Sequence, residues 1–166
     1  PTGAKSLADA LASGRAVLSS LNLSRNNLTI HNGKDMSGIQ ALAAALSSGS
    51  SVLKNLSVAR NNIDGEAAQQ LATAALSSTS LEVFSEIPIK ELRADTLTEL
   101  NLFNKGVGVS GALVLATFIE GSSVLTSLSL ADNNLTNFGS DMSGVKALAD
   151  ALASGTAVLT TLKCVF

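Results

Sequence analysis

The sequence has few of the residues that most specialised sites and small stabilised folds require. Its 166 residues include one cysteine, one histidine and two prolines, with no tryptophan or tyrosine. A single cysteine, Cys164, cannot form an internal disulfide, and Cys164 together with His31 is too small a set for a zinc site. We therefore expect neither a disulfide framework nor a metal site.

Charged residues are also scarce, and their signs are nearly balanced. They make up 14% of the chain, the formal net charge is −2, and Lys and Arg are spread along the sequence. A nucleic-acid partner held by basic charge is therefore not expected. The longest uncharged run, residues 36–53, contains Gln40 and a Ser/Gly cluster, so we expect no membrane span. The 46% of hydrophobic residues is enough to build a buried core.

What the sequence does contain is a repeat. Leu, Ala and Ser account for 74 residues, and a recurring unit explains the bias. Residues 35–53 read DMSGIQALAAALSSGSSVL, residues 141–159 read DMSGVKALADALASGTAVL, and residues 2–18 are a third copy. Copies run into the spacing L-x-x-L-x-L-x-x-N-x-L, which starts at positions 18, 53, 97 and 125 and begins again at 159. Self-similarity of this kind predicts a stack of similar units.

This spacing resembles that of leucine-rich repeats, and the attached G-x-x-x-L-x-x-x-L helix is similar to the ribonuclease-inhibitor-like subclass. Residues 84–100, which read F-x-x-I-P-I-K-E-L-R-A-D-T-L-T-E-L, resemble a signature that recurs in long leucine-rich-repeat arrays of algal and other protist proteins. The resemblance covers the whole chain and implies an α/β fold, a right-handed leucine-rich-repeat solenoid (horseshoe) with a parallel inner sheet and outer helices. The alternation of Leu21 and Leu23, and apolar residues four apart such as Leu42 and Leu46, are consistent with strands and helices that share a core.

We expect residues 1–166 to form a single array that is a segment of a longer one, because neither end carries a polar capping unit. Its uncapped ends would then offer contacts. The resemblance also implies that Asn26, Asn61 and Asn133 form a buried ladder that bonds to backbone groups of the turns, with Lys105 interrupting it.

Three segments depart from the regular unit. Residues 81–96 are too short for a crossover helix and contain Pro88, so we expect a helix-less coil at which strand pairing stops or bulges. Residues 29–35 and 136–141 lengthen the turn between strand and helix. Insertions on one edge of a solenoid often lie on its binding side.

Motifs that resemble catalytic or cofactor sites are explained by the repeat. Gly106, Gly108 and Gly111 match G-x-G-x-x-G after a strand, and Asp132 ends the next strand, as in dinucleotide-binding folds. Gly111, however, aligns with the helix-opening glycines of two other units, and no second nucleotide-binding half is present. His31 lies beside the Asn-Gly turn signal, without a catalytic set around it. We expect no cofactor and no enzyme activity.

The solvent side of the strands is left to carry function. Most of its residues are small and polar, whereas strong protein interfaces depend on aromatic and Arg side chains. With the exposed-looking residues of the insertions, the candidate protein-binding residues are Arg25, Lys54, Arg60, Glu99, Phe103, Asp132 and Phe138.

The sequence therefore favours a non-catalytic protein-protein interaction or scaffold module that presents the concave sheet face to a protein partner, and we expect it to be intracellular. The alternative is a structural subunit permanently embedded in a large multi-protein assembly. A sheet face that is merely solvated is a competing interpretation of its small polar residues. The inner face, the charged segment 81–99 and the two insertions all remain candidate binding regions.

Overall fold

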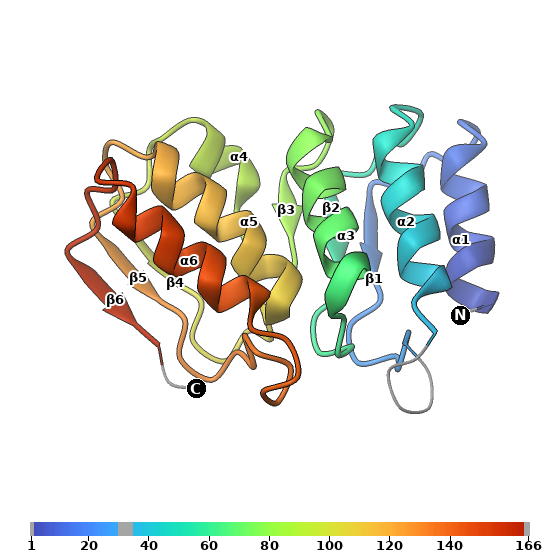
Figure 1. Ribbon diagram of the computed structural model, residues 1–166. Coiled ribbons are helices and arrows are strands. Elements are labelled where there is room, and N and C mark those ends of the chain that lie inside the picture. Colours follow the sequence, from blue (N-terminus) through green and yellow to red (C-terminus); the bar gives the residue numbers. More distant parts are fainter. Residues whose placement is uncertain (1, 30–34, 165–166) are drawn as a thin grey trace.

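The computed structural model describes residues 2–29 and 35–164, in which short strands alternate with helices (Figure 1). The elements are α1 (Thr2–Ala12), β1 (Ser20–Asn22), α2 (Ser37–Ser47), β2 (Asn55–Ser57), α3 (Gly65–Ser77), β3 (Val83–Phe84), α4 (Ile89–Arg93), β4 (Glu99–Asn101), α5 (Gly108–Gly121), β5 (Ser127–Ser129), α6 (Ser143–Ala153) and β6 (Thr161–Lys163). The fold is therefore α/β, as the sequence predicts.

The strands pair in parallel and form two sheets of three, in the orders β1-β2-β3 and β4-β5-β6. Leu56 lies opposite Leu21 in the first sheet, and Leu128 lies opposite Leu100 in the second. The expected parallel pairing is therefore present, in two sheets of three strands, and no pairing joins β3 to β4 among the described residues. Leu56 and Leu128, on central strands, are fully buried, whereas Leu21 and Leu100 lie on edge strands and are half-buried.

The helices lie side by side along one side of the strands, and the core fills the space between the two layers (Figure 1). Small residues let neighbouring helices approach closely. At Gly144 a Cβ atom would lie 2.8 Å from Cβ of Ala112, so the contact between α5 and α6 requires a glycine there. This explains the repeated glycine near the helix starts as a packing residue.

Asn61 and Asn133 form the predicted buried ladder. Asn61 Oδ1 accepts the N–H groups of Asn26 and Leu28, and its Nδ2 donates to the carbonyl of Leu23, all in the preceding unit. Asn133 makes the same kind of contacts with residues 102–107. Asn26 itself is exposed, so it is not a buried ladder residue in this chain.

Residues 81–96 contain a helix, so the expected helix-less coil is corrected to a shortened unit. Helix α4 spans five residues directly after Pro88, where a proline without an N–H costs no helical hydrogen bond. Ile89 and Leu92 of this helix are buried in the core. Strand β3 ends at Phe84, so pairing does stop before Pro88 as predicted. Because α4 is so short, α3 packs directly against α5.

Candidate functional site

All seven predicted binding residues are exposed, and four of them lie in or next to strands without lining the cavity that the other three share. Arg25 follows β1, Lys54 precedes β2, Glu99 begins β4, and Phe103 follows β4 with 52% of its surface exposed. Lys54 Nζ lies 3.1 Å from Glu82 Oε1, and Lys90 pairs with the same carboxylate at 3.6 Å. Ion pairs this exposed add little to stability, so these side chains stay available to a partner.

The other three predicted residues come together. Arg60, Asp132 and Phe138 line one cavity of about 300 Å³, which we call the edge pocket. Its walls come from parts of residues 58–63 after β2, 106–110 at the start of α5, and 132–138 after β5. The sequence proposed these three residues separately, as two strand-end residues and one insertion residue. The structure brings them to one place.

One wall of the edge pocket is the insertion at 136–141, which we call the strap loop. It follows β5 but reaches back past the start of α5 to the start of α3. Asn137 Nδ2 donates to Asp64 Oδ2 at 2.6 Å, and Asp141 Oδ2 accepts the N–H of Gly65 at 2.7 Å. In Figure 1 the strap loop lies at the bottom of the view, next to the turn that leads into α3.

Asp141, the last residue of the strap loop, bonds to the first residue of two helices, α3 and α6. Its Oδ1 accepts the N–H of Ser143 at 2.8 Å, so one carboxylate caps the start of α6 as well as that of α3. Partial burial would raise the pKa of Asp141, but hydrogen bonds from Ser143 and Gly65 outweigh it and lower the pKa below its ordinary value. Negative charge at a helix N-terminus is favourable, which stabilises this closure.

The tip of the strap loop is strained. Asn137 and Phe138 are consecutive non-glycine residues with φ of 46° and 57°, in the left-handed region. The N–H of Phe138 donates to Asn134 Oδ1 at 2.7 Å, which holds this turn in place. Each such residue costs on the order of 1–3 kcal/mol, and strain of this kind clusters at ligand clamps. Here it presents Phe138, 83% exposed, at the pocket.

Arg60 is held on the opposite wall. Its Nη2 donates to both O and Oδ1 of Asn104, each at 2.6 Å. The side chain also packs on Gly106, where a Cβ atom would lie 2.5 Å from Arg60 Cγ. Gly111 is likewise needed for packing, because its Cβ would lie 2.5 Å from Val107 Cγ1. Two glycines of the G-x-G-x-x-G motif therefore have packing roles, which agrees with the prediction from the repeat.

Sequence reasoning missed two polar groups of the edge pocket. Ser110 is 4% exposed and lines the pocket near the start of α5. Asn137 Oδ1 is buried and has no partner in the same part of the chain. The helical pattern does not distinguish Ser110 from other small residues. Asn137, by contrast, lies in the insertion at 136–141, which the sequence identifies as a candidate binding region.

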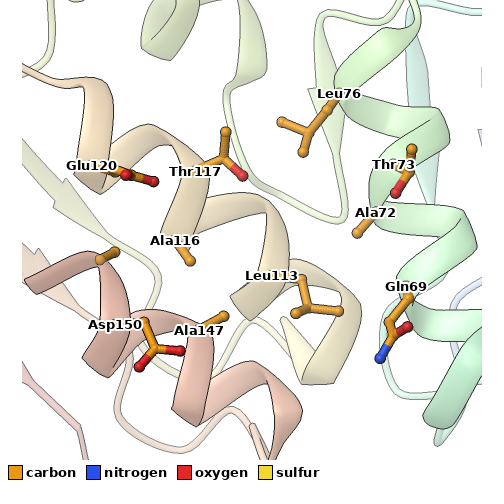
Figure 2. A pocket seen from close by; sticks show the side chains of 11 residues that line it. Gln69, Ala72, Thr73, Leu76, Leu113, Ala116, Thr117, Glu120, Ala147 and Asp150 are labelled. Carbon is orange, nitrogen blue, oxygen red and sulfur yellow. The ribbon is translucent and has the colours of Figure 1, made fainter. Parts of the chain in front are cut away.

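A second hollow lies on the helical side of the molecule, and it has fewer features of a binding site than the edge pocket (Figure 2). Residues of α3, α5 and α6 line it, with Leu76 and Leu113 pointing into it and Glu120 and Asp150 near one end. A comparable hollow lies between α2 and α3. Such furrows therefore accompany the packing of neighbouring helices. The two buried polar atoms that lack partners in the described chain, in Asn137 and Ser143, belong to neither hollow.

No protein-family model matches the chain, and no curated protein matches it. None of the helices in residues 2–29 and 35–164 is long and apolar enough to cross a membrane. Within the same residues, no group of three or more His, Cys, Asp or Glu side chains could hold a metal ion. His31 and most of the insertion at 29–35 lie outside the described residues.

Proposed function

We propose that this chain is a non-catalytic protein-interaction or scaffold module of the leucine-rich-repeat type. In this proposal the units stack as a right-handed solenoid, and a protein partner contacts its concave strand face together with the edge pocket. The compartment we propose is intracellular.

The observation that supports the proposal most is the convergence of Arg60, Asp132 and Phe138 on one pocket. Arg and aromatic side chains supply much of the binding energy at protein interfaces. Arg60 is fixed by Asn104, and Phe138 is presented by a loop that is bonded to Asp64. Side chains held before binding lose little conformational freedom when a partner arrives.

Charge along the strand ends supports an oriented partner. Arg25, Arg60 and Asp132 occupy the same position in their units, are exposed, and share a left-handed backbone with φ of 58°, 58° and 60°. The sign changes from positive to negative along this column. Exposed charges of this kind act mainly on the association rate and its salt dependence.

The test compares two charge reversals in the full-length chain. Proteins that co-purify with it are identified, and their association rates are measured with Arg60→Glu and with its counterpart Arg25→Glu. Slower association in both variants at low salt supports binding along the strand-end column. Slower association in Arg60→Glu alone supports binding at the edge pocket. A stoichiometric partner that survives high salt and both substitutions favours the permanently embedded subunit instead.

A further inference from the structure

We propose that the edge pocket recognises an acidic and a basic side chain that lie two residues apart on an extended segment of a partner protein. The acidic side chain would bond to Arg60, and the basic one would lie against Asp132 and Phe138. This inference rests on the proposed interaction function and specifies the partner segment that the pocket fits.

Arg60 supplies a cation that is held in position before a partner arrives. Its Nη2 donates to O and Oδ1 of Asn104, each at 2.6 Å. Its stem lies across Gly106, where a Cβ atom would come within 2.5 Å of Arg60 Cγ. A surface arginine that served only solubility would need neither contact. The guanidinium has further N–H donors on Nη1 and Nε, and such donors suit a carboxylate.

Asp132 places the opposite charge on the same cavity. It is exposed and lines the edge pocket together with Arg60. Within residues 2–29 and 35–164, neither side chain takes part in an ion pair, so each charge stays available to a ligand. The cavity of about 300 Å³ is at the lower end for ligand pockets and accommodates side chains rather than a helix. The edge pocket therefore presents a positive and a negative end to a partner.

The separation of the two charges suits alternate residues of an extended chain. The Arg60 guanidinium is bonded at Asn104, and the N–H of Asn104 donates to the carbonyl of Ala131, next to Asp132. Neighbouring strands are about 5 Å apart, so the two charges lie about 5–10 Å from each other. Side chains at positions i and i+2 of an extended segment are about 7 Å apart on one face. Such a segment can reach both charges, with the residue between them pointing away from the pocket.

Phe138 adds a contact for the basic side chain. Its ring is 83% exposed and lies on the same wall of the pocket as Asp132. The bond from Asn137 to Asp64, at 2.6 Å, holds the strap loop that carries it. Lys and Arg pack their apolar stems on such a ring, and their cations are attracted to its face. The predicted partner segment is therefore Asp or Glu, any residue, then Lys or Arg, in either chain direction.

The direct test uses a matched pair of capped peptides with the full-length chain. The probe Ac-Ala-Glu-Ala-Lys-Ala-NH2 carries both charges, and Ac-Ala-Gln-Ala-Gln-Ala-NH2 is a neutral control of similar shape. Amide chemical shifts in NMR titrations should report a dissociation constant on the order of 1 mM for the charged probe, with changes centred on residues 104, 132 and 138. The neutral control should bind about four- to tenfold more weakly, and high salt should remove most of that difference. Equal affinities at low salt, or shifts that leave these residues unchanged, would overturn the inference.

Double-mutant cycles assign each charge of the probe to its contact. Replacing Glu or Lys of the probe by Gln should weaken binding to the wild-type chain by about two- to fivefold. In Arg60→Gln the change of Glu should have no further effect, and in Asp132→Asn the change of Lys should have none. The matched control is Arg25→Gln, which should retain both effects, because Arg25 has the same repeat position and backbone φ but lies outside the pocket. Cycles that show no coupling contradict the inference.

Two of the variants keep the test independent of folding. Residue 132 has φ of 60°, which Asn tolerates, so Asp132→Asn should fold even if Arg60→Gln does not. The side chain of Phe138 is mostly exposed, so Phe138→Ala should also fold, and it should weaken binding of the charged probe by about two- to fivefold. An unchanged affinity in Phe138→Ala contradicts the contact between this ring and the basic side chain.

The outcome is separable from that of the proposed function. A co-purified partner should contain an exposed segment with the predicted charges, and replacing both charged residues of that segment by Gln should weaken its binding to the chain. A partner that binds equally well after this change, and equally well to Asp132→Asn, overturns the inference while the interaction function stands. Absence of any protein partner contradicts the interaction function, and the peptide titration still decides whether the pocket recognises the paired charges.

Discussion

The regular units and the short unit at 81–96 are tied to their neighbours by different chemistry. In the regular units, buried Asn61 and Asn133 bond to backbone groups of the preceding turn. In the short unit, no such amide is present; the buried Ser85 hydroxyl accepts the N–H of Val58 in the preceding unit, and the charged side chains Arg93 and Asp95 make further bonds to both neighbours. Neutral amides suit a buried ladder, whereas long or ionised side chains can work from the surface.

Arg93 and Asp95 point in opposite directions along the chain. Arg93 donates to four carbonyls at and beyond the end of α3, at 2.8–3.1 Å, those of Ala75, Leu76, Ser78 and Leu81. Asp95 accepts the hydroxyl of Ser122 at 2.5 Å and the N–H of Ser123 at 3.0 Å, after α5. A unit with only a five-residue helix thus caps the ends of the two long helices beside it.

The largest expected effect tests whether the apolar core is continuous through the short unit. Phe84 is fully buried in β3, so Phe84→Ala should lower the free energy of unfolding by about 3–5 kcal/mol. Leu128→Ala, its counterpart on a central strand of a regular unit, should cost about 2–5 kcal/mol. Denaturant unfolding measures both. A loss below about 1 kcal/mol for Phe84→Ala would show that the short unit contributes little to the core.

The next effect tests the amide ladder. Asn133→Ala removes an oxygen that accepts three N–H groups and a nitrogen that donates to three carbonyls, most of them buried. We expect a loss of about 2–4 kcal/mol, and a similar one for Asn61→Ala. Asn26→Ala is the control, because Asn26 is exposed and should change stability by about 0.5 kcal/mol or less. Similar losses at all three positions would contradict the distinction between buried and exposed Asn.

These two tests bear on what the sequence could predict. The repeat spacing identified the strands, the helices, Asn61 and Asn133, because identical local environments recur in each unit. It could not predict that the sheet separates between β3 and β4, since this depends on how the short unit fits between two regular ones. Helix α4 was missed because five residues after a proline carry too little periodicity to distinguish a helix from a coil.

The candidate site was predictable only in part. Arg60, Asp132 and Phe138 were found from residue type and position in the repeat, but their meeting depends on the strap loop. The bond from Asn137 to Asp64 joins residues 73 positions apart, and no local pattern encodes such a contact. Ser110 and Asn137 became candidates only through the packed structure, which places both in the lining of the edge pocket and leaves the buried Asn137 Oδ1 without a partner among the described residues.

A smaller loss of stability is expected when Arg93, the cationic side chain of the short unit, is replaced. Arg93→Met keeps much of the apolar stem but loses all four bonds to carbonyls, and it should cost about 1–2 kcal/mol, since part of the side chain is solvated. Arg93→Lys sharpens the result, because it retains the charge but not the planar fork that reaches several acceptors. If Lys restores full stability in thermal unfolding, charge near the end of α3 matters and the fork geometry does not.

The smallest effect concerns Asp95 and is expressed as a pH dependence. Hydrogen bonds from the side chain of Ser122, then from the side chain and N–H of Ser123, lower the pKa of Asp95 from 3.8 in the folded state. A lowered folded-state pKa means that the unfolded chain takes up the proton first as the pH falls. The stabilisation by Asp95 is therefore fully present above the unfolded pKa and is lost as the pH falls through the folded one.

The measurement compares the wild-type chain with Asp95→Asn in thermal unfolding from pH 7 to pH 2. The difference in midpoint should be constant down to about pH 5 and should shrink below it, because the protonated carboxyl of the wild type then resembles the amide. The double substitution Ser122→Ala, Ser123→Ala is the matched control, since it removes both hydroxyl donors and should reduce the same acid-dependent difference. A difference that persists unchanged to pH 2 would mean that Asp95 acts through packing, and the contrast between charged and amide ties would then rest on Arg93 alone.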